Sequence, residues 1–232
     1  MIRIPPARGT RIAIVIGALM AVGALIAAVL IWPAQRTPES AHSADIMRLP
    51  LVIKDLPKGF TVTAGEKVLG AADIAALKAP AEGVVKPAAC AATPADRADN
   101  VLGARLNIVN ASRDGVLYMI TAQEARETSA PHTDSAIDCS YTTVERPNGY
   151  IITTPAVAPV VAGLKIEALH IVTKAGTTIQ DSYLFRTWID PRRVVSVVVR
   201  SDPSHRPPAN PVDPTFAKHL LERAITVVRV AD

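Results

Sequence analysis

Aromatic residues are scarce in this sequence, and their scarcity excludes one class of protein. Phe, Trp and Tyr make up only 4% of the 232 residues. Proteins that bind single-stranded nucleic acid stack the bases on aromatic rings, and this chain has few rings to offer. A long basic run is also missing. Three of the 25 basic residues precede the first hydrophobic segment: Arg3, Arg8 and Arg11. Without them the chain has 22 basic and 21 acidic residues. The nearly neutral remainder predicts no nucleic-acid partner.

Signatures of known catalytic sites are missing as well. The sequence has no Gly-x-Ser-x-Gly elbow, no His-Glu-x-x-His pair, no phosphate-binding loop and no Gly-x-Gly-x-x-Gly turn. The histidines are scattered and form no pair at helical spacing: His42, His132, His170, His205 and His219. We therefore predict no catalytic residues, no cofactor and no metal site, and we interpret the protein as a non-enzyme.

Some polar residues could still belong to a site. The segment 132–134, His-Thr-Asp, holds the one close His/Asp pair, in a loop rich in Pro, Ser and Thr where solvent exposure is the simpler interpretation. His170 lies in a strand-like run, where a hydrogen-bonded sheet histidine is the simpler interpretation. Asp181, Arg186 and Asp190 fall on or near one predicted strand, where they could line a pocket or be ordinary surface charges.

One long apolar segment dominates the N-terminal part of the chain. Residues 12–32 consist of Ala, Val, Ile, Leu, Met, Gly and a terminal Trp. As a helix this segment would span about 31 Å, which matches the hydrocarbon core of a bilayer. The arginines before it favour a cytoplasmic N-terminus by the positive-inside rule. We therefore predict a single-pass protein of the cell membrane with a cytoplasmic tail at residues 1–11 and an extracytoplasmic C-terminal domain.

Two alternatives for this segment stay open. A cleaved signal peptide is one, although its apolar region is usually only about 7–15 residues long, and Ala41-His42-Ser43 is a weak cleavage site far downstream. The other concerns pairing of anchors. Ala13, Gly17 and Ala21 repeat at four-residue spacing, a small-xxx-small pattern that could pack two such helices together. Ala and Gly are also simply common in membrane helices.

Cysteine is scarcer than the aromatic residues. The two cysteines, Cys90 and Cys139, both follow the apolar segment, and an extracytoplasmic location permits a disulfide. A bridge between them would close a loop of about 50 residues and contribute roughly 4 kcal/mol in the chain-entropy treatment. The alternative is a redox-active or metal-binding pair, for which Cys-x-x-Cys spacing and a histidine cluster are both missing. We predict a structural disulfide.

The rest of the chain divides into a linker and one domain. Residues 33–48 contain Pro, Ser and Ala without hydrophobic periodicity, which predicts a juxtamembrane linker. We place the domain at residues 49–232. Turn signals such as Asp114-Gly115 separate its strands. The predicted strands are 105–111, 116–122, 139–145, 150–154, 165–173, 179–189 and 194–200. Their short connections imply antiparallel neighbours.

The last predicted strand, 194–200, is almost continuously apolar and must be covered on both faces. Asp213 is a suitable N-cap and Pro214 a suitable first helical residue. Apolar residues then recur at helical spacing: Phe216, Leu220, Leu221, Ala224, Ile225 and Val228. A shorter helix is predicted at residues 71–78. The fold class is therefore α+β: an antiparallel β-sheet covered by a C-terminal helix and preceded by one transmembrane helix.

Several short motifs point to a family. Residues 55–60, Asp-Leu-Pro-Lys-Gly-Phe, open the domain, a Pro-x-x-Cys runs from Pro87 to Cys90, and residues 211–221 close it. Together they resemble a mycobacterial and actinobacterial family of envelope domains of unknown function, whose members are secreted, lipid-anchored or membrane-anchored. They are also similar, more distantly, to the extracellular sensor domain of mycobacterial serine/threonine kinases. The resemblance implies an extracytoplasmic location and an α+β fold, and it supplies no catalytic residues.

The functional expectation follows from the anchor, the nearly neutral domain and the missing catalytic motifs. We expect a non-enzymatic, sensor-like envelope module that binds a lipid, a glycan or a protein partner, at residues the sequence does not identify. A structural or assembly role and an envelope hydrolase are the alternatives. A cavity between sheet and helix would support a small ligand. A hydrolase would need a nucleophile or paired carboxylates that converge in one cleft.

Overall fold

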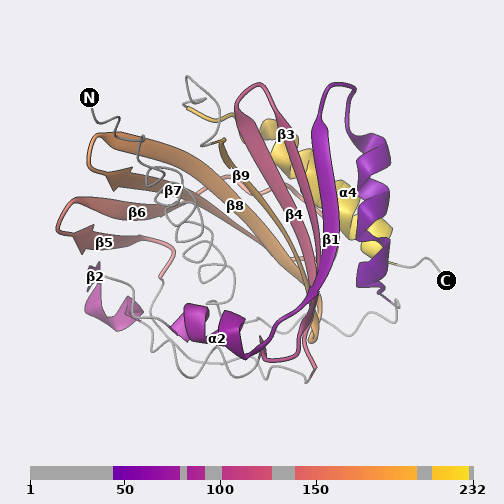
Figure 1. The fold of residues 1–232 in the computed structure, drawn as a ribbon, viewed down its shortest axis with the longest axis horizontal. Helices are drawn as coiled ribbons and strands as arrows, with labels where there is room; N and C mark the ends of the chain where they lie inside the picture. Colours follow the sequence, from indigo (N-terminus) through magenta and orange to yellow (C-terminus); the bar gives the residue numbers. More distant parts are fainter. Residues whose placement is uncertain (1–43, 79–82, 92–100, 127–138, 203–210, 230–232) are drawn as a thin grey trace, which may run out of the picture.

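The architecture is one large antiparallel sheet with helices on both sides (Figure 1). The computed structural model describes residues 44–78, 83–91, 101–126, 139–202 and 211–229. Within these ranges nine strands follow the order β1-β3-β4-β9-β8-β7-β6-β5-β2. The strands are β1 (Thr61–Val68), β2 (Val84–Lys86), β3 (Arg105–Arg113), β4 (Val116–Glu124), β5 (Thr142–Arg146), β6 (Gly149–Pro155), β7 (Ile166–Ala175), β8 (Thr178–Asp190) and β9 (Arg193–Ser201). The helices are the 3-10 helices η1 (Ile46–Asp55) and η2 (Ala88–Cys90) and the α-helices α2 (Ala71–Lys78) and α4 (Thr215–Val228).

Tight turns build the central hairpins. Asp114 and Gly115 join β3 to β4 with φ values of 51° and 78°. Positive φ at both central residues gives a turn whose twist matches that of the flanking strands, and Asp-Gly tolerates it well. Two-residue connections also join β5 to β6, β7 to β8 and β8 to β9. Every pairing in the sheet is antiparallel, as the turn signals predicted.

The predicted C-terminal helix is confirmed as the cover of the last strand. Helix α4 packs on the side of the sheet that carries Val195, Val197 and Val199, which we call the helix face. The helix residues buried against it recur every three or four positions: Ala217, Leu220, Leu221, Ala224, Ile225 and Val228. The helix begins at Thr215 with Pro214 as its N-cap, one residue later than predicted. Asp213 nevertheless accepts a hydrogen bond from the Thr215 N–H at 2.9 Å, so it satisfies one free donor at the start of the helix.

A second helix on the helix face was not predicted. Helix η1 begins at Ile46, inside the stretch interpreted as linker, and the side chain of Asp45 caps it by accepting from Met47 N. Ile46, Leu49 and Val52 are buried at a spacing of three, the period of a 3-10 helix. Helix η1 packs against α4, β3 and β4 (Figure 1). The backbone of Asp45 also donates to Val228 O at 2.8 Å, which ties the start of the domain to its end.

The opposite face of the sheet holds two smaller apolar clusters. Leu169, Ile171, Leu184 and Val198 form one in the middle of the sheet. The other packs Ile74 of α2 against Leu106 of β3, beside Leu69, Val101 and Ala104. Strand β9 is therefore buried on both faces, as its continuous apolar sequence required.

The N-terminal predictions fall outside the described residues. These are the cytoplasmic tail at 1–11, the transmembrane helix at 12–32 and the linker as far as residue 43. In the part of the chain that the structure describes, no helix is both long and apolar enough to cross a bilayer.

Candidate functional site

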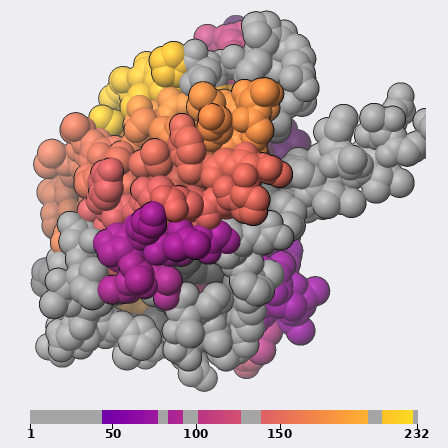
Figure 2. Space-filling view, turned by 90° about the vertical axis from the view of Figure 1, so that its left-hand side faces the viewer, coloured from indigo at the N-terminus to yellow at the C-terminus, as the bar shows by residue number. Residues whose placement is uncertain are grey.

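The two edges of the sheet differ in how they are protected. Strand β2, at one end, has three residues, Pro87 follows it, and Lys86 pairs with Glu145 at 2.7 Å. Figure 2 views the molecule from this side, where the short β2 and η2 segment lies along β5. Strand β1, at the other end, has eight residues, and all except Val62 are exposed. It contains no proline, and its pairing with β3 shows no bulge. Short length, proline, bulges and charged side chains are the usual devices that keep a sheet edge from pairing with another chain. Of these devices, β1 has only the charged side chains of Glu66 and Lys67.

Hydrogen bonding fixes which backbone groups of β1 are open. Leu69 exchanges hydrogen bonds with the 103–104 segment, at 2.9 Å to Ala104 O and 2.8 Å from Gly103 N. Along an antiparallel strand, residues alternate between bonding one neighbour and the other. The residues of β1 that bond β3 are therefore Lys67, Gly65, Thr63 and Thr61. The N–H and C=O groups that point outward belong to Val62, Ala64, Glu66 and Val68.

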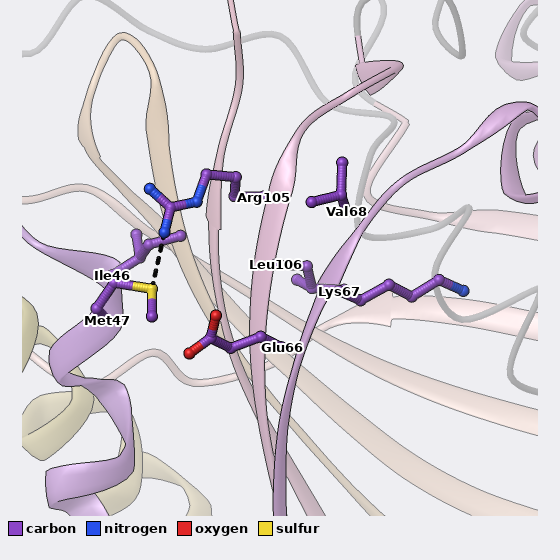
Figure 3. A pocket seen from close by; sticks show the side chains of 7 residues that line it. All are labelled: Ile46, Met47, Glu66, Lys67, Val68, Arg105 and Leu106. Atoms are coloured by element: carbon purple, nitrogen blue, oxygen red, sulfur yellow. Dashed lines mark hydrogen bonds between the residues drawn. The ribbon is translucent and has the colours of Figure 1, made fainter.

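A shallow hollow of about 110 Å³ lies next to this edge. It is lined by residues from η1, β1 and β3: Ile46, Met47, Glu66, Lys67, Val68, Arg105 and Leu106 (Figure 3). Met47 and Arg105 face one another across it, and Arg105 Nη2 approaches Met47 Sδ to 3.1 Å. Lys67 extends away from this pair. The hollow thus combines apolar side chains with two cations, Lys67 and Arg105, and one carboxylate, Glu66.

The charges around the hollow are unequally paired. Lys67 forms an ion pair with Asp73, and this hydrogen bond, helped by the Gly70 N–H, holds the pKa of the Asp73 carboxyl below its ordinary value. Arg105 reaches Glu124 only at 4.0 Å, because Arg193 holds that carboxylate at 2.6 Å. Among the described residues, Glu66 has no ion-pair partner. Glu66 is therefore available to a molecule that docks at this edge, beside an Arg105 held only by Met47 and a long contact to Glu124.

His170 takes part in a second polar cluster, on the helix face. Its Nε2 atom contacts the carboxylate of Asp181, and its ring stacks on Tyr183 with centroids 4.4 Å apart. Asp181 is only 6% exposed, and it also accepts from Val212 N at 3.2 Å. Burial, with the nearby charges of Asp181 and Asp213, raises the pKa of the Tyr183 hydroxyl.

This cluster holds the chain in place ahead of α4. Within the described residues His170 makes no other hydrogen bond. A hydrolytic His/Asp pair needs a nucleophile on the second ring nitrogen. The arrangement instead fastens the segment at Val212 to the sheet, so we interpret His170 as a structural sheet histidine.

The remaining polar candidates do not converge. Asp181 and Arg186 lie five residues apart on β8, and odd separations place side chains on opposite faces of a strand. Arg186 is buried on the opposite face with Glu167, whose Oε2 atom lies 2.8 Å from its Nε. Asp190, at the end of β8, pairs with Arg193 at 2.8 Å. The three residues therefore line no common pocket.

The other histidines supply no site within the described residues. His42, His205 and the 132–134 segment lie outside them. His219 is exposed on α4, 3.6 Å from Glu222. No group of three or more metal-ligating side chains occurs in the described ranges.

Arg200 is a buried cation that sequence reasoning missed. It lies on the opposite face, only 8% exposed. Burial lowers the pKa of its guanidinium, and the charge of Asp202 opposes that effect. Its neighbours in register, Ser182 and Leu117, offer a hydroxyl and an apolar side chain. No signal in the sequence distinguishes it from the exposed arginines.

The two cysteines are joined in the structure, in agreement with the predicted pairing. The sulfur atoms of Cys90 and Cys139 are 2.09 Å apart and their Cα atoms 5.6 Å apart. The bond links η2 to the chain that enters β5, so it reinforces the edge of the sheet that already carries the short β2 strand.

Strand β1 itself was missed by the sequence analysis. Thr61-Val62-Thr63 is β-branched and favours a strand, but Ala64-Gly65-Glu66-Lys67 is made of residues that strands disfavour. Pairing with β3 overrides this weak local preference. The β-branched triplet was the one signal that could have identified the edge.

Comparisons with known proteins place the fold and the family. An X-ray structure of an uncharacterized protein from Mycobacterium smegmatis, the Rv0999 ortholog, matches with a TM-score of 0.64 and 19% identity. The match covers 81% of this chain and 98% of that chain, and at this identity it shows a shared fold. No curated protein matches. A family model described as Domain of unknown function (DUF5642) matches residues 45–229. The chain therefore belongs to the DUF5642 family.

Proposed function

We propose that this protein is a single-pass envelope protein whose extracytoplasmic domain binds a protein partner along the open edge of β1 and catalyses no reaction. One observation carries the proposal: β1 is an eight-residue edge strand with seven exposed residues, and it lacks the short length and the proline that protect the β2 edge. Adding a strand to an open edge is a common way for proteins to recognise one another, because backbone groups supply the hydrogen bonds.

The packing of the core favours a protein over a small ligand. Between the sheet and α4, side chains such as Phe185, Val197 and Leu221 are fully buried, with no exposed surface. The hollow beside β1 holds about 110 Å³, whereas pockets for small ligands usually hold about 300–1,000 Å³. This hollow therefore offers little enclosed space to a lipid or glycan. A flat strand with a shallow hollow suits an extended polypeptide.

The location outside the membrane is part of the same proposal. It is supported by the apolar segment at residues 12–32, by the arginines before it and by the Cys90–Cys139 disulfide, which an oxidising compartment favours. The resemblance to envelope domains and, more distantly, to kinase sensor domains supports a sensor-like role.

Site-directed photocrosslinking of the full-length protein in cells tests the proposal. A photoreactive amino acid at Thr63, on the exposed edge, should give covalent products of higher mass that contain a second polypeptide. The control is the same amino acid at Val160, which is 95% exposed but distant from β1 in the sheet order. Products from Thr63 and none from Val160 are expected. Absence of any polypeptide product from Thr63 would overturn the proposal.

A further inference from the structure

The open backbone groups of β1 are evenly spaced about Gly65, so this strand can pair in antiparallel orientation with a second copy of itself. Val62, Ala64, Glu66 and Val68 direct their backbone N–H and C=O groups outward. These four residues are centred on Gly65. A two-fold axis through Gly65, perpendicular to the sheet, would bring a second copy of β1 alongside in antiparallel orientation. Each outward residue of one copy would then face an outward residue of the other.

We infer that the partner at this edge is a second copy of the same chain, paired through β1 in the register that places Gly65 opposite Gly65. The inference rests on the proposed function and names its partner. In this register all four outward residues of each copy form hydrogen-bonded pairs, so the two nine-stranded sheets become continuous. A register shifted by two residues, centred on Ala64, would leave Val68 without an outward partner among the strand residues.

The side chains also fit this register. On the helix face, Val62 of each copy lies opposite Val68 of the other, so the dimer contains this apolar pair twice. Val68 is 62% exposed in the single chain, although it is apolar, and the pairing would cover it. Ala64 lies opposite Glu66 and Thr63 opposite Lys67, so no like charges stand directly opposite one another. At the axis, Gly65 has open space where a side chain would be.

One contact between the two copies opposes the pairing, and its removal should have a measurable effect on dimerisation. The two Glu66 carboxylates would occupy diagonal positions, about 7–8 Å apart, where like charges repel. Glu66 has no ion-pair partner in the described chain to offset this repulsion. The Glu66→Gln substitution should therefore tighten the dimer a few-fold, an effect that a role in folding alone would not produce.

Disulfide trapping in the full-length protein tests the register. In an antiparallel pair, residues opposite one another without hydrogen bonds have Cα atoms about 4.5 Å apart, which suits a disulfide. Gly65→Cys should thus give a covalent dimer when membranes are treated with a mild oxidant. Thr63→Cys is the matched control, because the two copies of residue 63 would lie about 13 Å apart at 3.3 Å per residue. We expect at least tenfold more dimer from Gly65→Cys.

Sedimentation of the detergent-solubilised full chain provides a second measurement that needs no new cysteine. Val68→Lys should raise the dimer dissociation constant at least tenfold, and Val160→Lys, at a more exposed valine, should leave it unchanged. Equal trapping at positions 63 and 65, or a chain that is monomeric throughout the micromolar range, would overturn the inference. If photocrosslinking at Thr63 captures a different polypeptide, the second-copy inference fails while the proposed function stands.

Discussion

At the scale of single residues, Gly149 shows how closely backbones approach in this sheet. A Cβ atom at this position would lie 1.9 Å from Lys174 O and 2.7 Å from the carbonyl carbon of that residue. Gly149 opens β6 and pairs with Ala175 of β7. The obstacle is backbone, so it cannot turn aside as a side chain would. We predict that Gly149→Ala destabilises the protein by about 1–3 kcal/mol or more, measured by urea unfolding.

Gly65 is the matched control for this substitution. It also lies in a strand, but a Cβ atom there would meet nothing within 4 Å. Gly65→Ala should therefore be neutral, or stabilise by about 0.5–1 kcal/mol, because glycine is costly within a strand. Both variants are compared at low protein concentration to keep association out of the measurement. An unchanged unfolding midpoint for Gly149→Ala would show that β6 and β7 do not approach as described.

At the scale of elements, the attachment of α4 depends on one buried carboxylate. Asp181 bonds both His170 and the backbone of Val212, three residues before Thr215, the first residue of α4. Removing a buried partner leaves a donor unsatisfied, which costs about 1–3 kcal/mol. We predict that Asp181→Ala destabilises the protein by about 2–3 kcal/mol and speeds amide hydrogen exchange in the first turn of α4.

An exposed ion pair on the same helix provides the comparison. Asp55 bonds Arg223 of α4 at 3.1 Å, and both side chains are in contact with solvent. Surface ion pairs contribute about 0–1 kcal/mol. Asp55→Ala should therefore change the free energy of unfolding by no more than about 1 kcal/mol, and the exchange rates in α4 by no more than this energy allows. If the amide groups of α4 exchange as slowly in the Asp181→Ala variant as in the wild type, the helix is held by its apolar face alone.

The elements also show what could be predicted from sequence. Strands β3, β4 and β6 to β9 follow strong turn signals and β-branched runs, and α4 follows an apolar stripe with a cap, so local preference and tertiary packing agree. Helix η1 was missed because its period is three and Pro50 lies inside it. Strand β1 was missed because it is stabilised by pairing with β3, whose residues lie 37 to 51 positions away, from Val68 with Arg105 to Thr61 with Ser112.

The candidate site was predictable only in part for the same reason. Polar residues that are close in sequence, such as Asp181 and Arg186, are separated by the alternation of side chains along a strand. Residues that meet at the hollow, such as Met47 and Arg105, are 58 positions apart. A sequence pattern shows which residues are close along the chain. It does not show which distant residues meet in the fold, because that depends on the order of strands in the sheet.

At the scale of the whole molecule, the Cys90–Cys139 disulfide constrains the edge of the sheet farthest from β1. It closes a loop with a sequence separation of 49 residues. In the chain-entropy treatment a loop of this length contributes about 4 kcal/mol by restricting the unfolded chain. We predict that the double variant Cys90→Ser/Cys139→Ser loses about 2–5 kcal/mol of unfolding free energy. Unfolding curves for the oxidised wild type and the double variant check this prediction.

The same disulfide reports on where the domain folds. A cytoplasmic domain would keep both thiols reduced, whereas a domain exported across the membrane would oxidise them. In full-length protein taken from cells and quenched with acid, a maleimide polymer should add no mass before reduction and two polymer masses after it. The Cys139→Ser variant is the control, because its remaining thiol should react once without reduction. Two additions to the unreduced wild type would contradict both the disulfide and the extracytoplasmic location, and would direct the search for partners of β1 to the cytoplasm.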